Sequence, residues 1–221
     1  MVLFSVLRTE IAKVGRTMNI QSQVRRLVDA GAHEAAGLSA EGFADHAENL
    51  PDEPGVVLAV HPSLISARDL VALLDRAGKP GFVVSDMTDL HAFTAIEGLQ
   101  VPDSPLYLLH DVDRGDHMSN WSPNEALPAI EALGRSPLTV HEGLSWIIQE
   151  PKVLERNHCF MTIGSRKVGA KGLDARTPAI WISNGTGRDG KRNMGAAKLG
   201  WCWAGNRHTW LGFASTSARI N

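Results

Sequence analysis

The chain has 221 residues, of which 43% are hydrophobic and 21% charged, a composition that excludes disordered and collagen-like proteins. The net charge of −2 conceals an asymmetry: residues 1–150 hold 10 Lys/Arg and 21 Asp/Glu, whereas residues 151–221 hold 12 and 3. This distribution indicates either a basic surface for an anionic partner or two halves of the chain that attract each other.

Hydrophobic spacing predicts that the first part of the chain is helical. Residues 2–14 follow a helical period, Asn19 can cap a second helix that Gly31 ends, and Ser39 can begin a third. We therefore expect a helical N-terminal segment over residues 1–54 and an α+β domain over residues 55–221, together forming one compact unit.

The chain then changes to short apolar runs that are typical of strands. These runs occupy residues 55–60, 81–85 and 105–110, and Ser66 can cap a helix that follows the first of them. The alternation of strand and helix predicts a small α/β layer.

Two helices are predicted after this layer. Pro123 suits the first position of a helix, which Pro128 would bend or interrupt. Thr139, with Glu142 three residues later, forms a capping box for a helix over residues 140–149.

From residue 158 the hydrophobic pattern alternates with a period of two, which predicts a C-terminal antiparallel sheet of about four strands. The runs are HCFMTIGS, PAIWIS, KLGWCWAG and HTWLGFAS. We expect them to form a meander in which residues 204–209 make a tight hairpin connection. In the third run, Trp201 and Trp203 share one face, while Gly200 and Cys202 lie on a small-residue face that a ligand or backbone can approach.

Residues 184–197 form a basic, glycine-rich loop that contains a GxGxxG pattern at Gly185, Gly187 and Gly190. A dinucleotide site also needs a following amphipathic helix and a downstream acidic residue, and both are missing here. We therefore expect no cofactor, and we interpret the segment as a mobile loop that can order around an anion.

Residues 110–117 (HDVDRGDH) hold the densest set of oxygen and nitrogen ligands in the chain. They indicate either a divalent metal site or a solvated acidic loop with one Asp–Arg pair. The spacing matches neither an EF-hand nor HExxH, which favours the solvated loop. With two cysteines and no CxxC, we also expect reduced thiols and no structural zinc.

Six segments carry a family resemblance. They are GRSPLTVHEG, NHCF, GSR, YLLHDVDRG, PAIWIS and, most specifically, KLGWCWAGNRHTWLG (residues 198–212). In these segments the chain resembles an actinobacterial family defined by a domain of unknown function, so the resemblance implies no particular activity. Its matching positions that are able to carry chemistry are Asp113, Arg114, Arg135, Glu142, Cys159, Arg166, Cys202, Asn206 and His208.

The main functional hypothesis is a cytoplasmic protein of small-molecule metabolism, such as a biosynthetic enzyme, that acts on an anionic or planar substrate. Its catalytic candidates are His208, Cys202 and Asp113, able to supply acid–base or nucleophilic chemistry. Its substrate-binding candidates are Arg114, Arg135, Arg166, Trp201, Trp203 and Asn206. We expect Arg114, Arg166, Cys202 and His208 to line one cavity.

Two alternatives are a non-catalytic module that binds a ligand or a protein, and a binder of single-stranded nucleic acid. The overall acidic balance and the lack of an RNA-binding motif argue against the second. No run approaches the ~18 apolar residues of a membrane span, and residues 1–14 lack the features of a signal peptide. We therefore expect a small-molecule partner and no membrane partner.

Overall fold

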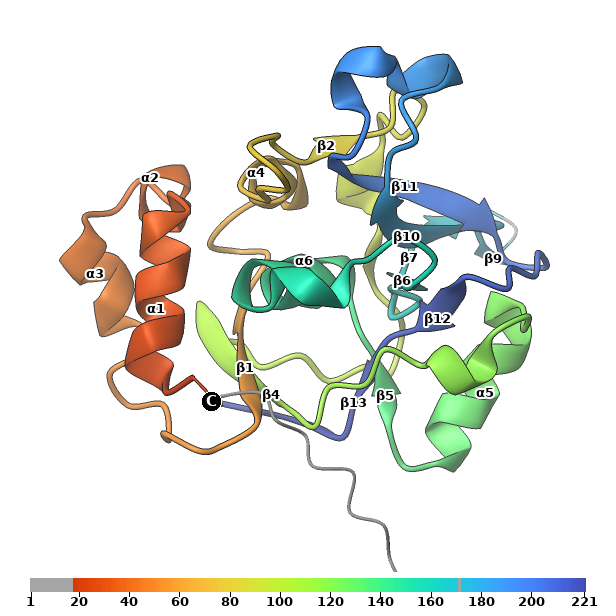
Figure 1. Cartoon of the computed structure of the whole chain (residues 1–221). Helices are drawn as coiled ribbons and strands as arrows, with labels where there is room; N and C mark the ends of the chain where they lie inside the picture. Colours follow the sequence, from red (N-terminus) through yellow and green to blue (C-terminus); the bar gives the residue numbers. More distant parts are fainter. Residues whose placement is uncertain (1–17, 171) are drawn as a thin grey trace, which may run out of the picture.

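A computed structural model describes residues 18–170 and 172–221. These residues fold as an α+β structure with two main sheets and six α-helices, as Figure 1 shows. The helix predicted over residues 2–14 lies outside the described residues. Within the described part of the chain, no helix is long and apolar enough to cross a membrane.

The first sheet is antiparallel and has the strand order β1-β4-β14. Strand β1 (Val56–Val60) pairs with β4 (Leu106–His110), and β4 pairs with β14 (Ala218–Ile220). Every residue of β1 is buried, because this strand has protein on both faces. Two of the predicted strands are therefore confirmed.

The second sheet has five strands in the order β12-β6-β10-β11-β2. Its strands are β2 (Phe82–Val83), β6 (Cys159–Met161), β10 (Arg176–Ile182), β11 (Ala197–Trp203) and β12 (Leu211–Phe213). Strand β10 pairs antiparallel with both β6 and β11, as expected for a meander.

The prediction that β12 completes this meander is wrong. Both edges of β11 are occupied, one by β10 and the other by β2, which runs parallel to it. Strand β12 therefore crosses the sheet and pairs in parallel with β6, so that Leu211 lies opposite Cys159. Residues 204–209 connect two strands that are not neighbours, and they form no tight hairpin.

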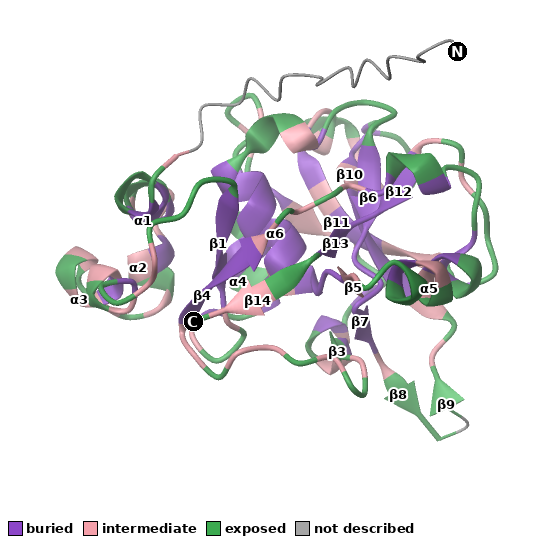
Figure 2. Ribbon diagram, turned by 90° about the horizontal axis from the view of Figure 1, so that it is seen from below, coloured by how far each residue is buried: buried purple, intermediate pink, exposed green. Residues whose placement is uncertain are grey.

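Three short strand pairs complete the β-structure. They are β3 (Thr94–Ala95) with β7 (Ser165–Arg166), β5 (Ser136–Pro137) with β13 (Ser215–Thr216), and β8 (Val168–Gly169) with β9 (Gly172–Leu173). The β8–β9 pair projects from the body of the protein and is exposed, as Figure 2 shows.

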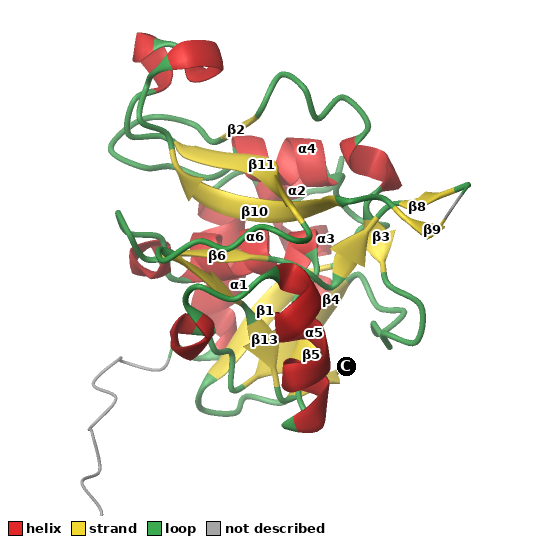
Figure 3. Ribbon diagram, turned by 90° about the vertical axis from the view of Figure 1, so that its right-hand side faces the viewer, coloured by secondary structure: helices red, strands yellow, loops and turns green. Residues whose placement is uncertain are grey.

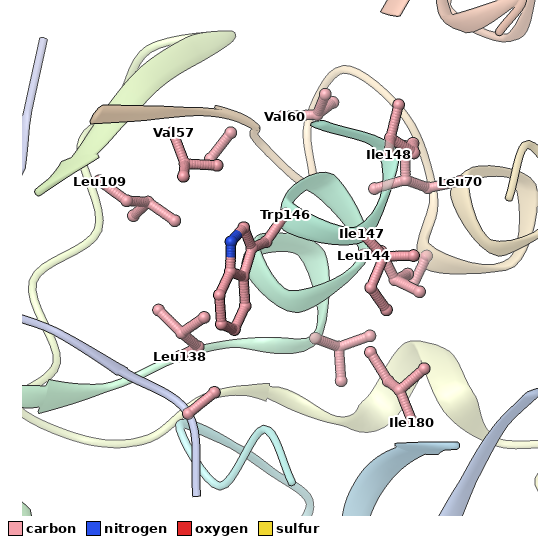
Figure 4. Packing of buried hydrophobic residues seen from close by; sticks show 14 of the residues in the cluster. Val57, Val60, Leu70, Leu109, Leu138, Leu144, Trp146, Ile147, Ile148 and Ile180 are labelled. Atoms are coloured by element: carbon pink, nitrogen blue, oxygen red, sulfur yellow. The ribbon is translucent and has the colours of Figure 1, made fainter. Parts of the chain in front are cut away.

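Helix α6 (Val140–Gln149) lies between the two sheets and is the centre of the fold (Figures 1 and 2). The Ser145 hydroxyl accepts a hydrogen bond from the backbone N–H of Val60 in β1, at 3.0 Å. On the other side, the Trp146 ring packs 5.2 Å from the Phe160 ring of β6. Figure 4 shows the side chains that both sheets direct at this helix. The two sheets thus share one hydrophobic core.

The other helices surround this core. They are α1 (Ile20–Asp29), α2 (Ala32–Ala35), α3 (Ala40–Asp45), α4 (Ala67–Ala72) and α5 (Pro123–Ala132), and Figure 3 shows α5 on the outside of the sheets. Five 3-10 turns lie in the connections: η1 (Leu90–Ala92), η2 (Asp116–Met118), η3 (Pro151–Val153), η4 (Gly187–Asp189) and η5 (Lys191–Asn193). The predicted side-chain caps Asn19, Ser39 and Ser66 all form, and so does the capping box of Thr139 and Glu142.

Residues 184–197, predicted to be a basic, glycine-rich loop, contain the 3-10 turns η4 and η5, which lie at the top of Figure 1. The Asp189 carboxylate accepts hydrogen bonds from Lys198 at 2.6 Å and from the Ser183 hydroxyl at 2.8 Å. Arg76 and Lys79 donate to backbone carbonyls at the other end of the segment. These hydrogen bonds connect the segment to the body of the protein, whereas its mobility and its ordering around an anion stay predictions.

Ion pairs connect the acidic and the basic parts of the chain. They are Lys167 and Arg176 with Asp89, Arg207 with Glu125, and Arg219 with Glu142. This pattern favours the interpretation in which the two halves attract each other.

The pair between Glu142 and Arg219 is the most deeply buried of these, with side chains 0% and 5% exposed. Arg219 of β14 donates to both carboxylate oxygens, at 2.5 and 2.8 Å, and also to the Pro137 carbonyl. The Tyr107 hydroxyl donates to the same carboxylate at 2.9 Å. Because Glu142 also accepts from the backbone N–H of Thr139, the first turn of α6 is fixed to β4 and β14.

Arg219→Met should lower the free energy of unfolding by about 3–5 kcal/mol, because Glu142 is then buried without its cation. Adding Glu142→Gln to this variant should lower the free energy of unfolding by less than Glu142→Gln lowers that of the natural chain. Urea titrations of the two single variants and the double variant measure this coupling. Arg207→Met, which breaks the exposed pair with Glu125, is the control and should cost less than about 1 kcal/mol.

Gly143→Ala should destabilise the protein by about 1–3 kcal/mol, although alanine is the better helix former. A Cβ atom at this position would lie 2.5 Å from the Thr162 methyl group and 3.1 Å from the Phe160 ring, so the helix and the sheet would have to separate. At Gly42 in α3 the nearest atom would be 3.5 Å away, and Gly42→Ala is therefore the matched control. Equal unfolding free energies for the two variants would contradict this account of the helix–sheet contact.

Candidate functional site

Cys202, the predicted nucleophile, lies on the small-residue face of β11, but the space beside it is filled. A Cβ atom at Gly200 would lie 2.7 Å from the Trp181 ring and 3.0 Å from Val84, so these two side chains occupy the face that we expected to be open. Burial raises the pKa of the Cys202 thiol to about 11, although Lys198 opposes this shift. The thiol is therefore protonated at neutral pH, which is the unreactive form of cysteine.

His208 lies with its ring 5.4 Å from that of Trp210, and its Nε2 is buried without a hydrogen-bond partner among the described residues. Burial lowers the pKa of His208. Asn206 is exposed in the same connection, where its backbone N–H donates to the Trp203 carbonyl.

The three predicted substrate-binding arginines are held by the protein itself. Arg114 pairs with Asp116 at 2.6 Å, and Arg135 pairs with Asp111 at 2.8 Å and donates to Ser215. The Arg166 side chain is buried and donates to the Asp174 carbonyl, and burial lowers its pKa.

The remaining predicted residues lie apart from one another. Asp113 and Arg114 line a cavity of about 470 Å³ together with His117, whereas Trp201 lines a different cavity of about 310 Å³ with Trp181. Trp203 is 48% exposed and packs edge-on against Trp201, with ring centroids 4.6 Å apart. The structure thus distributes the predicted site residues over separate surroundings and does not bring them to one cavity. No group of three or more metal-ligating side chains forms among the described residues.

A more enclosed cavity, of about 500 Å³, lies where the first sheet, α4, α6 and the β3–β7 pair meet. We call it the histidine cavity. Its apolar lining residues are Pro62, Ala67, Leu90, Phe93, Ala95 and Val101, and its polar lining residues are His61, Ser66, Arg68, Thr88, His91, Thr94, Thr139, His141 and Ser165. Its volume falls within the roughly 300–1,000 Å³ that small-molecule sites occupy.

Three of the polar groups are placed at this cavity by the elements next to them. His61 directly follows β1, and its backbone N–H donates to the Pro105 carbonyl at 2.9 Å. His141 is the second residue of α6, in the turn that the Thr139 capping box fixes. The Ser165 hydroxyl of β7 accepts from the Val140 N–H at 2.9 Å and so joins this turn to the β3–β7 pair. His141 therefore lies in the first turn of α6, and His61 lies at the start of the turn that follows β1.

The His141 imidazole is uncharged at neutral pH. Burial lowers its pKa to about 4, and the neighbouring His61 contributes to the shift, while the hydrogen bond to the Ile65 carbonyl opposes it. Burial also lowers the pKa of His61, against the opposing effect of Asp103. Both rings are therefore available as neutral hydrogen-bonding groups or as proton acceptors.

Sequence reasoning did not select His61 or His141. Two signals could have found them: His61 is a polar residue placed at the end of a wholly apolar strand, and His141 follows a capping Thr within the segment GRSPLTVHEG. What the sequence could not show is that these two places meet in space.

The architecture defines an α+β protein in which a central helix joins two sheets and a cavity of small-molecule size opens at the N-terminal end of that helix. The chain belongs to a family of unknown function, DUF5701, whose sequence model matches residues 26–221. No curated protein and no solved structure matches the chain.

The lowered pKa of His141 predicts a loss of stability in acid. Between pH 6.5 and pH 4 the unfolded chain binds a proton that the folded state excludes, so the folded state loses stability as the pH falls through this range. At pH 5 the loss due to His141 should be about 2 kcal/mol relative to pH 7. His141→Gln keeps an N–H for the Ile65 carbonyl but does not titrate. Between pH 7 and pH 5 its unfolding free energy should therefore fall by about 2 kcal/mol less than that of the natural chain. Urea titrations at the two pH values test this, and equal losses would contradict it.

Proposed function

We propose that the protein binds a small, largely apolar organic molecule in the histidine cavity. The observation that carries this proposal is an enclosed space of about 500 Å³ whose exposed wall surface is mainly apolar and whose lining includes two imidazoles. Cavities with this combination are the usual form of small-molecule sites, because apolar walls supply affinity and a few fixed polar groups supply orientation.

The energetics of burial favour such a ligand. Removing apolar surface from water is worth about 25 cal/mol per Å², and Leu90, Phe93 and Val101 offer that surface to a ligand. The two imidazoles add hydrogen bonds without adding charge at neutral pH. A ligand that is largely uncharged within the cavity therefore avoids the desolvation cost of a buried ion.

A catalytic role is the second candidate, in line with the expectation of an enzyme of small-molecule metabolism. One observation favours it: the cavity holds two imidazoles, His61 and His141, that are uncharged at neutral pH, and such rings can exchange a proton with a bound molecule. Turnover of a bound molecule that falls at least about 100-fold in His141→Gln, with binding retained, would distinguish catalysis from binding.

Val101→Trp tests the binding proposal, because an indole at this position should fill the histidine cavity. Toluene and benzamide are the probes, and ligand-observed NMR is the measurement. We expect at least one of them to bind the natural chain and to lose at least about tenfold in affinity in the variant.

Val112→Trp is the matched control, since Val112 lines the separate cavity of about 470 Å³. It should leave the affinity of both probes unchanged. Binding that Val101→Trp does not weaken, or that Val112→Trp weakens equally, would overturn the proposed site.

A further inference from the structure

The hydrogen bonds of His141 fix which of its ring nitrogens carries the proton. Nε2 lies 3.1 Å from the Ile65 carbonyl oxygen, which can only accept a hydrogen bond. Nε2 therefore carries the proton, and in the neutral ring Nδ1 carries the lone pair. His141 accordingly offers an acceptor to a molecule in the cavity.

His61 has the same tautomer, but here the protein contacts Nδ1 and leaves Nε2 without a partner, whereas in His141 it contacts Nε2. The backbone N–H of Ser63 donates to Nδ1 at 3.1 Å, and the Ser63 hydroxyl lies 2.7 Å from the same atom. Because Nδ1 accepts from a backbone N–H, the proton of the neutral ring lies on Nε2. His61 accordingly offers a donor.

These two atoms are left for a ligand. Neither His61 Nε2 nor His141 Nδ1 has a hydrogen-bond partner among the described residues. Both atoms are also accessible to solvent. Two residues of the cavity lining thus carry one donor and one acceptor without a protein partner, each on a ring whose other nitrogen contacts a backbone group.

We propose that the histidine cavity selects ligands with an uncharged amide-type group, in which an N–H and a C=O are adjacent, as in a carboxamide, a lactam or an imide. The ligand carbonyl would accept from His61 Nε2–H, and the ligand N–H would donate to His141 Nδ1. This inference rests on the proposed function and adds the chemical class of the ligand.

Charged groups fit this pair less well. A carboxylate has no proton to donate to His141 Nδ1, and an ammonium has no lone pair to accept from His61. Arg68 is the cation of the lining, but its side chain is exposed and reaches the Met87 carbonyl only at 3.5 Å, so it lies at the rim. A carboxylate held by Arg68 is therefore the competing arrangement that the experiment must separate.

The test compares five monosubstituted benzenes of similar size: benzamide, acetophenone, benzoate, benzylamine and toluene. Affinities for the natural chain are measured at pH 7 by ligand-observed NMR. Benzamide should bind at least about tenfold more tightly than acetophenone, which keeps the carbonyl but lacks the N–H, and than benzoate or benzylamine. Toluene reports the apolar contribution alone.

Two variants assign the donor. His61→Phe should weaken benzamide and acetophenone at least about tenfold and leave toluene unchanged, since only the first two carry a carbonyl. His117→Phe, in the separate cavity of about 470 Å³, is the control and should change none of the affinities.

The outcomes distinguish the two levels of the proposal. If toluene and benzamide bind equally and Val101→Trp blocks both, the cavity binds apolar molecules and the amide inference is overturned. If benzoate binds most tightly and Arg68→Met removes that preference, an anion is the ligand and the inference is also overturned. If no probe binds in a manner that Val101→Trp blocks, the proposed function fails together with the inference.

Discussion

The buried ion pair of Glu142 and Arg219 joins the first turn of α6 to the strand pair β4–β14. Two charges removed from water are tolerated only when every lone pair and proton finds a partner. Here Tyr107 of β4, the Thr139 backbone and the Pro137 carbonyl supply those partners. Burial and the adjacent carboxylate raise the pKa of Tyr107, so its hydroxyl keeps the proton that it donates. The pair consequently fixes the orientation of α6 between the sheets.

The histidine cavity depends on this arrangement. His141 is the neighbour of Glu142 in the first turn of α6, and His61 packs its ring 6.3 Å from that of Tyr107. A continuous set of contacts therefore leads from Arg219 to both imidazoles. Contacts between neighbouring side chains thus connect the buried ion pair to the ring positions on which the proposed donor and acceptor roles depend.

The local part of the fold could be predicted from the sequence. The caps at Asn19, Ser39 and Ser66 and the capping box of Thr139 use contacts within three residues, which a single sequence displays directly.

Long-range pairings could not be predicted in this way. Nothing in the residues near β12 shows that β2 already occupies the edge of β11, or that Trp181 fills the space over Gly200. The residues that we predicted to line one cavity do not do so, for the same reason. They were grouped because they are close along the chain or share an alternation pattern. The two histidines lie 80 positions apart and meet only because β1 and α6 are adjacent.

Both sheets pair strands from distant parts of the chain, and this pairing has a consequence for how the protein folds. Strand β12 is required at one edge of the larger sheet and β14 at one edge of the smaller, and both derive from residues 211–220. During folding, neither sheet is complete until that segment has docked, so one edge of each sheet stays unpaired until then. Folding intermediates with unpaired strand edges are prone to aggregation, so the docking of this one segment protects both sheets at once.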